Sequence, residues 1–386
     1  MTPAVAFRAS AWLPMMSKRA RVLSLLFWMA ILSPALVRDV AAASPPPLRF
    51  SAEFPVSPAM AARVRFWIRV FTEVSQHEAL LHDRDDLRVV YDVVPYDTER
   101  SVEPVRASYA RLLASLAVDE LFPLGIRDVS SFTPPAPERE RVHALFEAVA
   151  AARPIGYARA MTNIRAQRGL KEIFADSLVR AELYLPEIRR VFAAAQLPSE
   201  LAYLPHVESS FNPNALSRAG AAGLWQFTKD TADGRLRMTA GVDERFDPIR
   251  SSEAAAEHLA RARSVLGSWP LAIASYNHGV AGIARARAAV GSDSLDDIIR
   301  GYDGASFGFA SRNFYAEFLA AAHVAQHAAY YFPELKRTPV VQYVVRRGDS
   351  LWTIARKHRV SIQALVAANN LGRSPLQLGQ RLMIRL

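Results

Sequence analysis

The chain has 386 residues, enough for two or three domains, and its hydrophobic content of 51% is ample for a buried core. It contains no cysteine, which excludes disulfides, thiolate metal sites, cysteine nucleophiles and a lipid anchor on an N-terminal cysteine. The net charge of +10 is concentrated at the ends: residues 1–43 carry five Arg or Lys and one Asp, residues 336–386 carry ten and one, and the remainder is therefore close to −3.

The N-terminus has the pattern of a secretory signal peptide. Basic residues at 18–21 precede an apolar run at 22–37, and small residues at 41–43 offer a cleavage site. Pro34 interrupts the run, which is shorter than the roughly 20 residues that a membrane-spanning helix needs. We therefore predict a signal peptide at 1–43 and a location in the periplasm or cell envelope. Charged residues just before the cleavage site keep an uncleaved anchor as the alternative.

The basic C-terminal segment can meet nucleic acid, an anionic membrane or an anionic polymer. Secretion makes nucleic acid the least fitting of these partners. The nine histidines show no HExxH or paired spacing, so we predict no metal and no cofactor.

Residues 44–154 are predicted to form a helical N-terminal region with a possible β-hairpin, and helix is expected to continue beyond it. The expected elements are a helix at 58–75, β-like runs at 79–83 and 87–94, and helices at 101–119, 138–153 and 155–195, the last broken at 164–169. No pattern in this part of the chain indicates chemistry, so we predict that it is a scaffold.

Residues 198–227, PSELAYLPHVESSFNPNALSRAGAAGLWQF, hold the strongest candidate for a reactive group. Glu208 closes an apolar helical run, and an apolar cluster at Leu224, Trp225 and Phe227 follows a loop rich in Pro, Asn and Gly. An acid between hydrophobic walls at a helix C-terminus should have a raised pKa, because both surroundings disfavour its charged form. Such an acid can protonate a leaving oxygen near neutral pH. On local context alone, an ordinary helix-end glutamate is the simpler interpretation.

Residues further along can supply polar and aromatic walls for a site. A helix that starts at 269 ends with Tyr276 and Asn277, and the helix predicted at 310–332 carries Phe314 and Tyr315 near its start. With the amide of Gln226, these groups suit a sugar polymer, whose hydroxyls bond to amides and whose rings stack on aromatic faces. Tyr276 and Phe314 can equally be core residues.

The fold class also follows from the patterns after residue 195. No stretch between 196 and 335 alternates as a strand, so this part is predicted to be all-helical. After Pro339 the pattern changes to a strand at 341–345, two short helices at 351–357 and 361–369, and a strand at 380–384. This is a βααβ unit of about 45 residues, small enough to need close packing.

Three motifs in the middle of the chain resemble those of the soluble-lytic-transglycosylase family in both order and spacing. They are Glu208-Ser209-Ser210-Phe211, Ser217-x-x-Gly220-Ala221-x-Gly223-Leu224-Trp225-Gln226-Phe227 and Ala272-x-Ala274-x-Tyr276-Asn277-x-Gly279. The C-terminal unit resembles a LysM module through Tyr343-Val344-Val345-x-x-Gly348-Asp349-Ser350-Leu351-Trp352-x-Ile354-Ala355, Asn369-Asn370-Leu371 and Leu378-Gly379-Gln380-x-Leu382. The pairing of these two modules is typical of peptidoglycan enzymes.

The first resemblance implies a mainly α protein, with a lysozyme-like catalytic domain at 155–335 after the helical extension and before the LysM module at 340–386. That family cleaves the MurNAc–GlcNAc β-1,4 bond without water. Glu208 would protonate the glycosidic oxygen and then deprotonate the MurNAc 6-hydroxyl, which attacks C1 and leaves a 1,6-anhydro end. A glycosidase usually needs a second carboxylate. No acid in the motifs has a claim to that role, and an internal hydroxyl removes the need for it.

The resemblance also implies which residues hold the substrate. In the catalytic domain these are Ser209, Ser217, Gln226, Tyr276, Asn277 and either Phe314 or Tyr315. The LysM family binds GlcNAc-containing glycans, and the matching positions are Gly348, Asp349, Ser350, Leu351, Asn369 and Asn370. The chain departs from the family at Thr228, where many relatives carry methionine. The expected partner is the GlcNAc/MurNAc strand of peptidoglycan, and the oligomeric state stays open.

Two other functions remain. A muramidase or chitinase-like hydrolase could use the same acid, and a non-catalytic wall-binding protein would not need Glu208 at all. Product analysis separates the first from a transglycosylase, and the Glu208→Gln variant tests the second.

Overall fold

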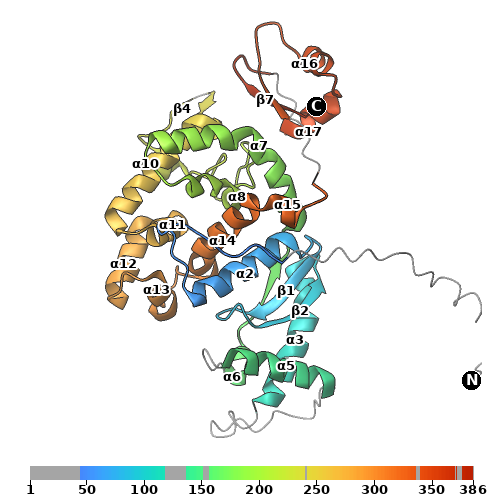
Figure 1. Cartoon of the computed structure of the whole chain (residues 1–386), viewed down its shortest axis with the longest axis vertical. Coiled ribbons are helices and arrows are strands. Elements are labelled where there is room, and N and C mark those ends of the chain that lie inside the picture. Colours follow the sequence, from blue (N-terminus) through green and yellow to red (C-terminus); the bar gives the residue numbers. More distant parts are fainter. Residues whose placement is uncertain are drawn as a thin grey trace, which may run out of the picture. The chain divides into compact units, whose positions relative to one another are not determined.

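The computed structural model describes residues 44–117, 136–150, 156–239, 241–335, 340–369, 371 and 376–385 (Figure 1). Residues 1–45 and 46–386 form separate units, and the predicted signal peptide at 1–43 lies outside the described residues. Within the described ranges, no helix combines the length and the apolar character needed to cross a bilayer.

One long helix, α14 (Phe309–Gln326), forms the centre of the middle domain. Its sequence, FASRNFYAEFLAAAHVAQ, is apolar on nearly every side, as expected of a helix that is enclosed by other elements. It packs against α2 (Pro58–Thr72), α11 (Trp269–His278), α8 (Pro205–Glu208) and the 3-10 turn η2 (Ser199–Tyr203). Its alanines at 316 and 320–322 are fully buried and allow these neighbours to approach closely.

The remaining helices complete the domain around α14. They are α7 (Lys171–Ala194), α9 (Lys229–Ala232), α10 (Pro248–Leu266), α12 (Val280–Val290), α13 (Leu295–Gly301) and α15 (Ala328–Tyr331). Asp247 caps α10 by accepting hydrogen bonds from the backbone N–H groups of Ile249 and Arg250, with Pro248 at the first helical position.

The prediction of an all-helical stretch from 196 to 335 is wrong at one place. The strands β4 (Met238–Thr239) and β5 (Val242–Asp243) pair as a short antiparallel hairpin, followed by the 3-10 turn η3 (Glu244–Phe246). Two residues a strand are too few for an alternating pattern to show in the sequence.

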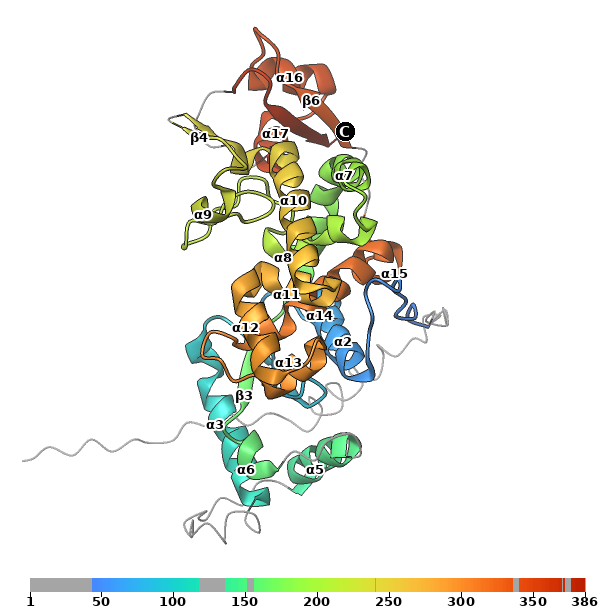
Figure 2. The same cartoon turned by 90° about the vertical axis from the view of Figure 1, so that its left-hand side faces the viewer.

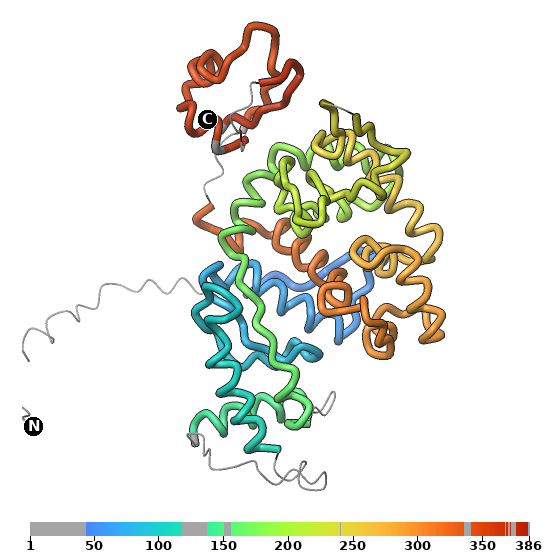
Figure 3. Tube along the Cα trace, turned by 180° about the vertical axis from the view of Figure 1, so that it is seen from behind, coloured from blue at the N-terminus to red at the C-terminus, as the bar shows by residue number. Residues whose placement is uncertain are grey.

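The N-terminal part contains a three-stranded antiparallel sheet in the order β2-β1-β3. The expected hairpin forms from β1 (Glu78–Asp83) and β2 (Val90–Pro95), and β3 (Ile164–Arg168) pairs with the other edge of β1 (Figure 3). The break predicted at 164–169 within the helical stretch 155–195 is therefore a strand, which the sequence analysis did not predict. Ile164 and Ala166 are buried and alternate with more exposed neighbours, which is a strand pattern. The expected domain boundary at 154–155 lies outside the described residues.

The two faces of this sheet belong to different cores. Leu80 packs with α2 in the main core, whereas Leu81 packs in a smaller cluster with residues of α3 (Glu99–Leu116) and α5 (Ala136–Ala150). The short helix α6 (Tyr157–Ala160) contributes Ala160 to the same cluster. Neighbouring side chains of a strand point to opposite faces, so β1 joins the two cores.

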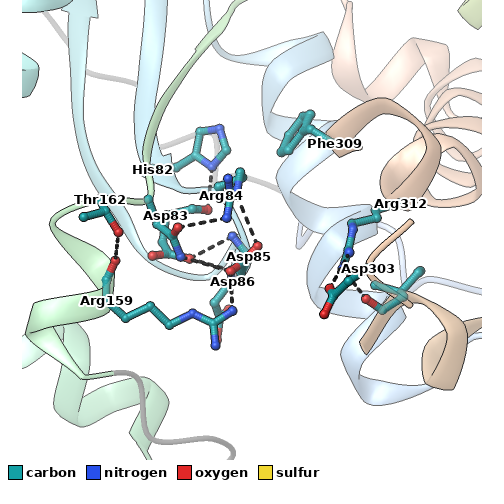
Figure 4. A network of polar contacts seen from close by, with 12 residues as sticks. His82, Asp83, Arg84, Asp85, Asp86, Arg159, Thr162, Asp303, Phe309 and Arg312 are labelled. Atoms are coloured by element: carbon teal, nitrogen blue, oxygen red, sulfur yellow. Dashed lines mark hydrogen bonds and ion pairs between the residues drawn. The ribbon is translucent and has the colours of Figure 1, made fainter. Parts of the chain in front are cut away.

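A charged turn after β1 fastens this region to α14. The carboxylate of Asp83 accepts hydrogen bonds of 2.8 Å from the backbone N–H groups of Asp85 and Asp86 (Figure 4). Arg63 of α2 donates to the carbonyl of Asp85 at 3.1 Å and to the buried side chain of Asn313 at 2.6 Å. The N-terminal region thus fixes the position of the helix at the centre of the next domain.

The C-terminal unit has the predicted βααβ order. It consists of β6 (Val340–Val344), α16 (Leu351–His358), α17 (Ile362–Asn369) and β7 (Arg381–Arg385), and the two strands pair antiparallel. Ser350 caps α16 in a reciprocal capping box with Thr353. Tyr343, Ile354, Leu365 and Leu382 belong to a small core within this unit.

Candidate active site

Glu208 lies at the end of α8, a helix of four residues that follows directly on η2. Two residues in the left-handed region come next, Ser210 with φ of 52° and Phe211 with φ of 55°. Phe211 donates its N–H to the Pro205 carbonyl at 2.9 Å and buries its ring completely. This tight reversal ends the helix at Glu208 and leaves the carboxylate half-buried at the C-terminal end.

A buried histidine holds α8 in place. His206 is 3% exposed and packs against the rings of Phe174 and Phe211, and its Nδ1 forms a hydrogen bond with Ser177 of α7. Burial, with a smaller contribution from Arg180, lowers the pKa of His206 to about 3. The imidazole is therefore neutral at physiological pH and acts as a packing residue beneath the helix that carries Glu208.

The loop at 217–227 forms the neighbouring wall. Gly223 has φ of +76°, and a Cβ there would lie 1.8 Å from the Arg245 carbonyl oxygen, so no other residue fits. The hydroxyl of Ser217 accepts from the Ala221 N–H at 3.0 Å, and the amide of Gln226 donates to the Gly223 carbonyl at 2.9 Å. Both predicted binding residues thus help to shape the loop.

Two hydrogen bonds join this loop to the residue that follows the acid and to α11. Ser209 donates its hydroxyl to the Leu224 carbonyl at 2.8 Å, and Tyr276 of α11 donates to the Trp225 carbonyl at 2.8 Å. Burial and the charge of Glu208 raise the pKa of Tyr276 well above its usual value, which places its phenol within the electrostatic reach of the carboxylate. The acid, the loop and α11 therefore form one assembly.

The aromatic candidates separate into two groups. The Phe314 ring is parallel to the Tyr276 ring with centroids 6.4 Å apart, whereas Tyr315 donates its hydroxyl to the Pro55 carbonyl at 3.2 Å. Of these two residues, Phe314 adjoins the site. Trp225 is fully buried, stacks on Phe192 and donates to Ser252, so it is a packing residue.

Asn277 is exposed at the end of α11. Its side-chain oxygen accepts a hydrogen bond from Ser311 of α14 at 2.8 Å. This contact orients the amide and leaves its NH₂ group as a donor beside the site.

The carboxyl of Glu208 has a strongly perturbed acidity. Burial is the main cause and the nearby charge of Glu317 the second, and together they raise the pKa of Glu208 to about 8. The carboxyl is therefore protonated at neutral pH, which is the form that can donate a proton. The sequence predicted this direction from apolar walls and a helix C-terminus.

Glu317 is the site residue that the sequence reasoning missed. It is half-buried on α14, eight residues after the start of the helix, and burial raises its pKa to about 8. It is the sole acid in FASRNFYAEFLAAAHVAQ, and a lone carboxylate in an apolar helix was the signal that could have found it. The site thus holds two carboxyl groups with raised pKa values from two elements.

The predicted glycan-binding residues of the C-terminal unit make mostly internal contacts. Asp349 accepts from the Tyr343 hydroxyl at 2.8 Å and from the Arg346 N–H at 2.7 Å, and the Asn369 amide donates to the Met383 carbonyl at 2.6 Å. Gly348 turns the chain with φ of +87°, Ser350 caps α16 and Leu351 begins it. Asn370 lies outside the described residues. Trp352, which that prediction omitted, is 55% exposed.

The described residues hold no cluster of three His, Asp or Glu side chains that could bind a metal ion. What the site does offer is acid–base chemistry from two protonated carboxyls next to a tyrosine and two amides.

Comparison with protein families defines the class of the two domains. Residues 192–299 match the family model described as Transglycosylase SLT domain, and residues 343–385 match the one described as LysM domain. The chain thus contains an SLT domain and a C-terminal LysM domain, which confirms the prediction from the motifs. The predicted fold class, mainly α with a lysozyme-like helical domain and a small LysM domain, is confirmed as well.

Individual relatives share parts of the chain. It is 36% identical over 118 residues to "Membrane-bound lytic murein transglycosylase D" of Escherichia coli (strain K12), which covers 30% of this chain and 26% of that protein. It is 38% identical over 109 residues to "Putative tributyltin chloride resistance protein" of Alteromonas sp. (strain M-1), covering 28% and 53%. It is 35% identical over 136 residues to "Membrane-bound lytic murein transglycosylase F" of Maricaulis maris (strain MCS10), covering 31% and 29%. The matched part of the chain spans about a quarter of the first relative and about half of the second.

Proposed function

We propose that this protein is a peptidoglycan lytic transglycosylase, which cleaves the MurNAc–GlcNAc β-1,4 bond and leaves a 1,6-anhydroMurNAc end. The observation that carries the proposal is the half-buried Glu208, whose pKa is raised to about 8 within the matched SLT segment. The names of two relatives, both lytic murein transglycosylases, support the same reaction.

In this mechanism Glu208 acts twice. Its carboxyl donates a proton to the glycosidic oxygen as the bond from C1 to that oxygen breaks, and it becomes a carboxylate. The carboxylate then takes the proton of the MurNAc 6-hydroxyl, whose oxygen forms the new bond to C1. The acid is thereby restored and no water enters the products. Because the 6-hydroxyl belongs to the same sugar, its high effective concentration replaces an enzyme nucleophile.

Glu317 raises the question of a second carboxylate. A retaining hydrolase needs an ionised nucleophile, and an inverting one needs an ionised base to activate water. With a pKa of about 8, Glu317 is protonated at neutral pH and suits neither role. We therefore favour the intramolecular route over the hydrolase, and assign to Glu317 the role of raising the pKa of Glu208 further on the alkaline side, where Glu317 itself ionises.

The substrate contacts are part of the proposal. Asn277 and Gln226 would bond to hydroxyls or acetamide groups, and Tyr276 with Phe314 would lie beside the acid. Ser209 and Ser217 would act through the turn and loop that they hold. Tyr315 is the weaker candidate for the last aromatic position because its hydroxyl bonds to Pro55.

The products of digestion test the proposed function. We expect purified protein to release fragments from sacculi that carry 1,6-anhydroMurNAc, detected by mass spectrometry as ends that borohydride does not reduce. A muramidase would instead give reducible ends heavier by one water. Reducible ends from the wild-type protein would establish the hydrolase, and absence of any cleavage would favour a wall-binding protein.

We further propose that the LysM domain binds the glycan strand and that the protein acts in the cell envelope. Deletion of residues 340–386 should weaken binding to insoluble peptidoglycan, measured by co-sedimentation, about tenfold or more, while kcat/KM on soluble fragments changes less than about twofold. Trp352→Ala, which removes an exposed aromatic side chain and leaves the core of the module in place, should reproduce part of the binding loss. Equal losses of binding and turnover would contradict a separate binding module.

A further inference from the structure

A positively charged pocket lies beside the active-site loop and has no part in the reaction described so far. Its volume is about 510 Å³, and it is lined by Gly234, Arg235, Leu236, Arg237, Glu244 and Arg250. These residues come from the turn after α9, from η3 and from the start of α10, which lie near the β4–β5 hairpin (Figure 2). Three guanidinium groups face one carboxylate, so the lining carries an excess positive charge.

The arginines keep most of their hydrogen-bonding capacity. Within the described residues, Arg250 pairs with Glu253 at 2.6 Å and Arg237 with Glu244 at 3.5 Å. Arg235 donates to the Thr231 carbonyl at 3.0 Å. A guanidinium carries five N–H donors, so each of these contacts uses a small part of its capacity. The side chains of Arg237 and Arg250 are 63% and 54% exposed, and a ligand can reach them.

The wall of the pocket is fixed to the active-site loop. Arg245 is 4% exposed and donates to the carbonyls of Gly220 at 2.8 Å and Phe227 at 3.1 Å. Its guanidinium also pairs with Asp243 at 2.7 Å. Together with the close approach of Gly223 to the Arg245 carbonyl, these contacts make the hairpin a rigid continuation of the loop that carries Ser217 and Gln226.

A histidine on the helix that carries Arg250 contacts the tyrosine of the active site. His258 of α10 packs edge-on against Tyr276, with ring centroids 5.5 Å apart, and against Phe227 at 6.0 Å. Burial and then the charges of Arg235 and Arg261 lower the pKa of His258 to about 4, so the imidazole is neutral at physiological pH. Helix α10 therefore carries both Arg250 of the pocket and His258, which contacts Tyr276 and Phe227 of the site.

We propose that this pocket, lined by Arg235, Arg237 and Arg250, binds a carboxylate of the peptide attached to the MurNAc that is being cleaved. The inference rests on the proposed function. The sugar rings offer hydroxyls and acetamides but no charge, whereas the peptide on the lactyl group carries carboxylates. A guanidinium group can donate two parallel hydrogen bonds to the two oxygens of a carboxylate. The pocket thus makes the enzyme prefer strands that still carry peptides.

The test compares glycan strands that carry peptides with the same strands after an amidase has removed the peptides, which leaves only the lactyl carboxylate on each MurNAc. We divide kcat/KM on the peptide-bearing strands by kcat/KM on the stripped strands. This ratio should fall about tenfold in Arg237→Ala/Arg250→Ala, because two exposed ion pairs with the peptide are lost. The change should come chiefly from a higher KM on the peptide-bearing strands. Arg237→Lys/Arg250→Lys should recover part of the ratio. The control Arg300→Ala removes a surface arginine that pairs with Asp297 on α13 and should leave the ratio unchanged.

Binding of the same strands to the inactive Glu208→Gln chain separates this inference from the proposed function, because it needs no turnover. Preference of that chain for peptide-bearing strands, lost on adding Arg237→Ala/Arg250→Ala, supports the pocket even if the products prove hydrolytic. An unchanged ratio, or an equal fall in the Arg300→Ala control, would overturn the inference. Free peptide released by the amidase should compete with the strands for binding. If inorganic phosphate competes and the free peptide does not, the inference is overturned in favour of a phosphate site.

Discussion

The Glu208→Gln variant should lose cleavage of peptidoglycan by about 10³-fold or more in kcat/KM, because it removes the one group that protonates the leaving oxygen and then deprotonates the 6-hydroxyl. Glutamine keeps the size and much of the polarity of the side chain, so binding of the strand should change little. The release of anhydro-ended fragments, followed by chromatography and mass spectrometry, measures the loss. Glu257→Gln, at an exposed position of α10, is the matched control.

The same variant should be more stable than the wild type, which separates inactivation from misfolding. Unfolded Glu208 releases its proton near its usual pKa of 4.5, whereas the folded state holds it to about 8. Between these values the folded state binds more protons, so this residue makes stability fall as the pH rises. Glutamine has no such charge. Its gain in the free energy of unfolding should be near zero at pH 4.5 and reach about 1–3 kcal/mol at pH 8. Full activity in the variant would refute the mechanism.

The sequence placed the acid correctly but could not place its neighbour. Glu208, Tyr276 and Gln226 fall in short motifs with fixed spacing, so their shared location was predictable. Glu317 lies on a different helix, more than one hundred residues after Glu208, and no motif contains it. Its proximity depends on how α14 packs against α8, which local periodicity does not specify. A lone acid within an apolar helix was the only indication.

The fold shows a similar limit. The helix expected to start at residue 269 was predicted closely, since α11 spans Trp269–His278. The stretch Ile164–Arg168 was predicted only as a break between helical stretches, because its five residues have too few apolar positions to indicate a strand. It becomes a strand through pairing with β1, some 80 residues earlier in the chain. Pairing over such a distance is tertiary information that strand propensity alone does not contain.

The N-terminal region gains a role from this arrangement. Arg63 bridges the turn after β1 and the buried Asn313, one helical turn before Glu317 on α14. Residues at i and i+4 lie on the same face of a helix, so the contact that fixes Asn313 also fixes Glu317. The scaffold predicted from the sequence therefore positions the second carboxyl of the site.

Glu317→Gln should shift the pH profile without abolishing activity. The charge of Glu317 contributes to the raised pKa of Glu208, so its removal lowers that pKa, while burial still keeps it above 4.5. A general acid is active in its protonated form. The alkaline limb of kcat/KM should therefore move to lower pH by about 0.5–1 unit, and activity at pH 6 should stay within about threefold of the wild type. Initial rates between pH 5 and 9 measure both.

The Glu317→Gln variant also distinguishes a hydrolase, in which Glu317 is the nucleophile or base, from a transglycosylase, in which Glu317 only raises the pKa of Glu208. If Glu317 were the nucleophile or the base of a hydrolase, Glu317→Gln would lose activity by about 10²-fold or more at every pH, as Glu208→Gln does. If Glu317 holds the proton on Glu208, the loss appears only on the alkaline side, where the lower pKa leaves less acid protonated. Glu257→Gln should leave the profile in place. The shape of the curve, rather than its height, thus distinguishes a residue that sets the acidity of Glu208 from one that takes part in bond cleavage.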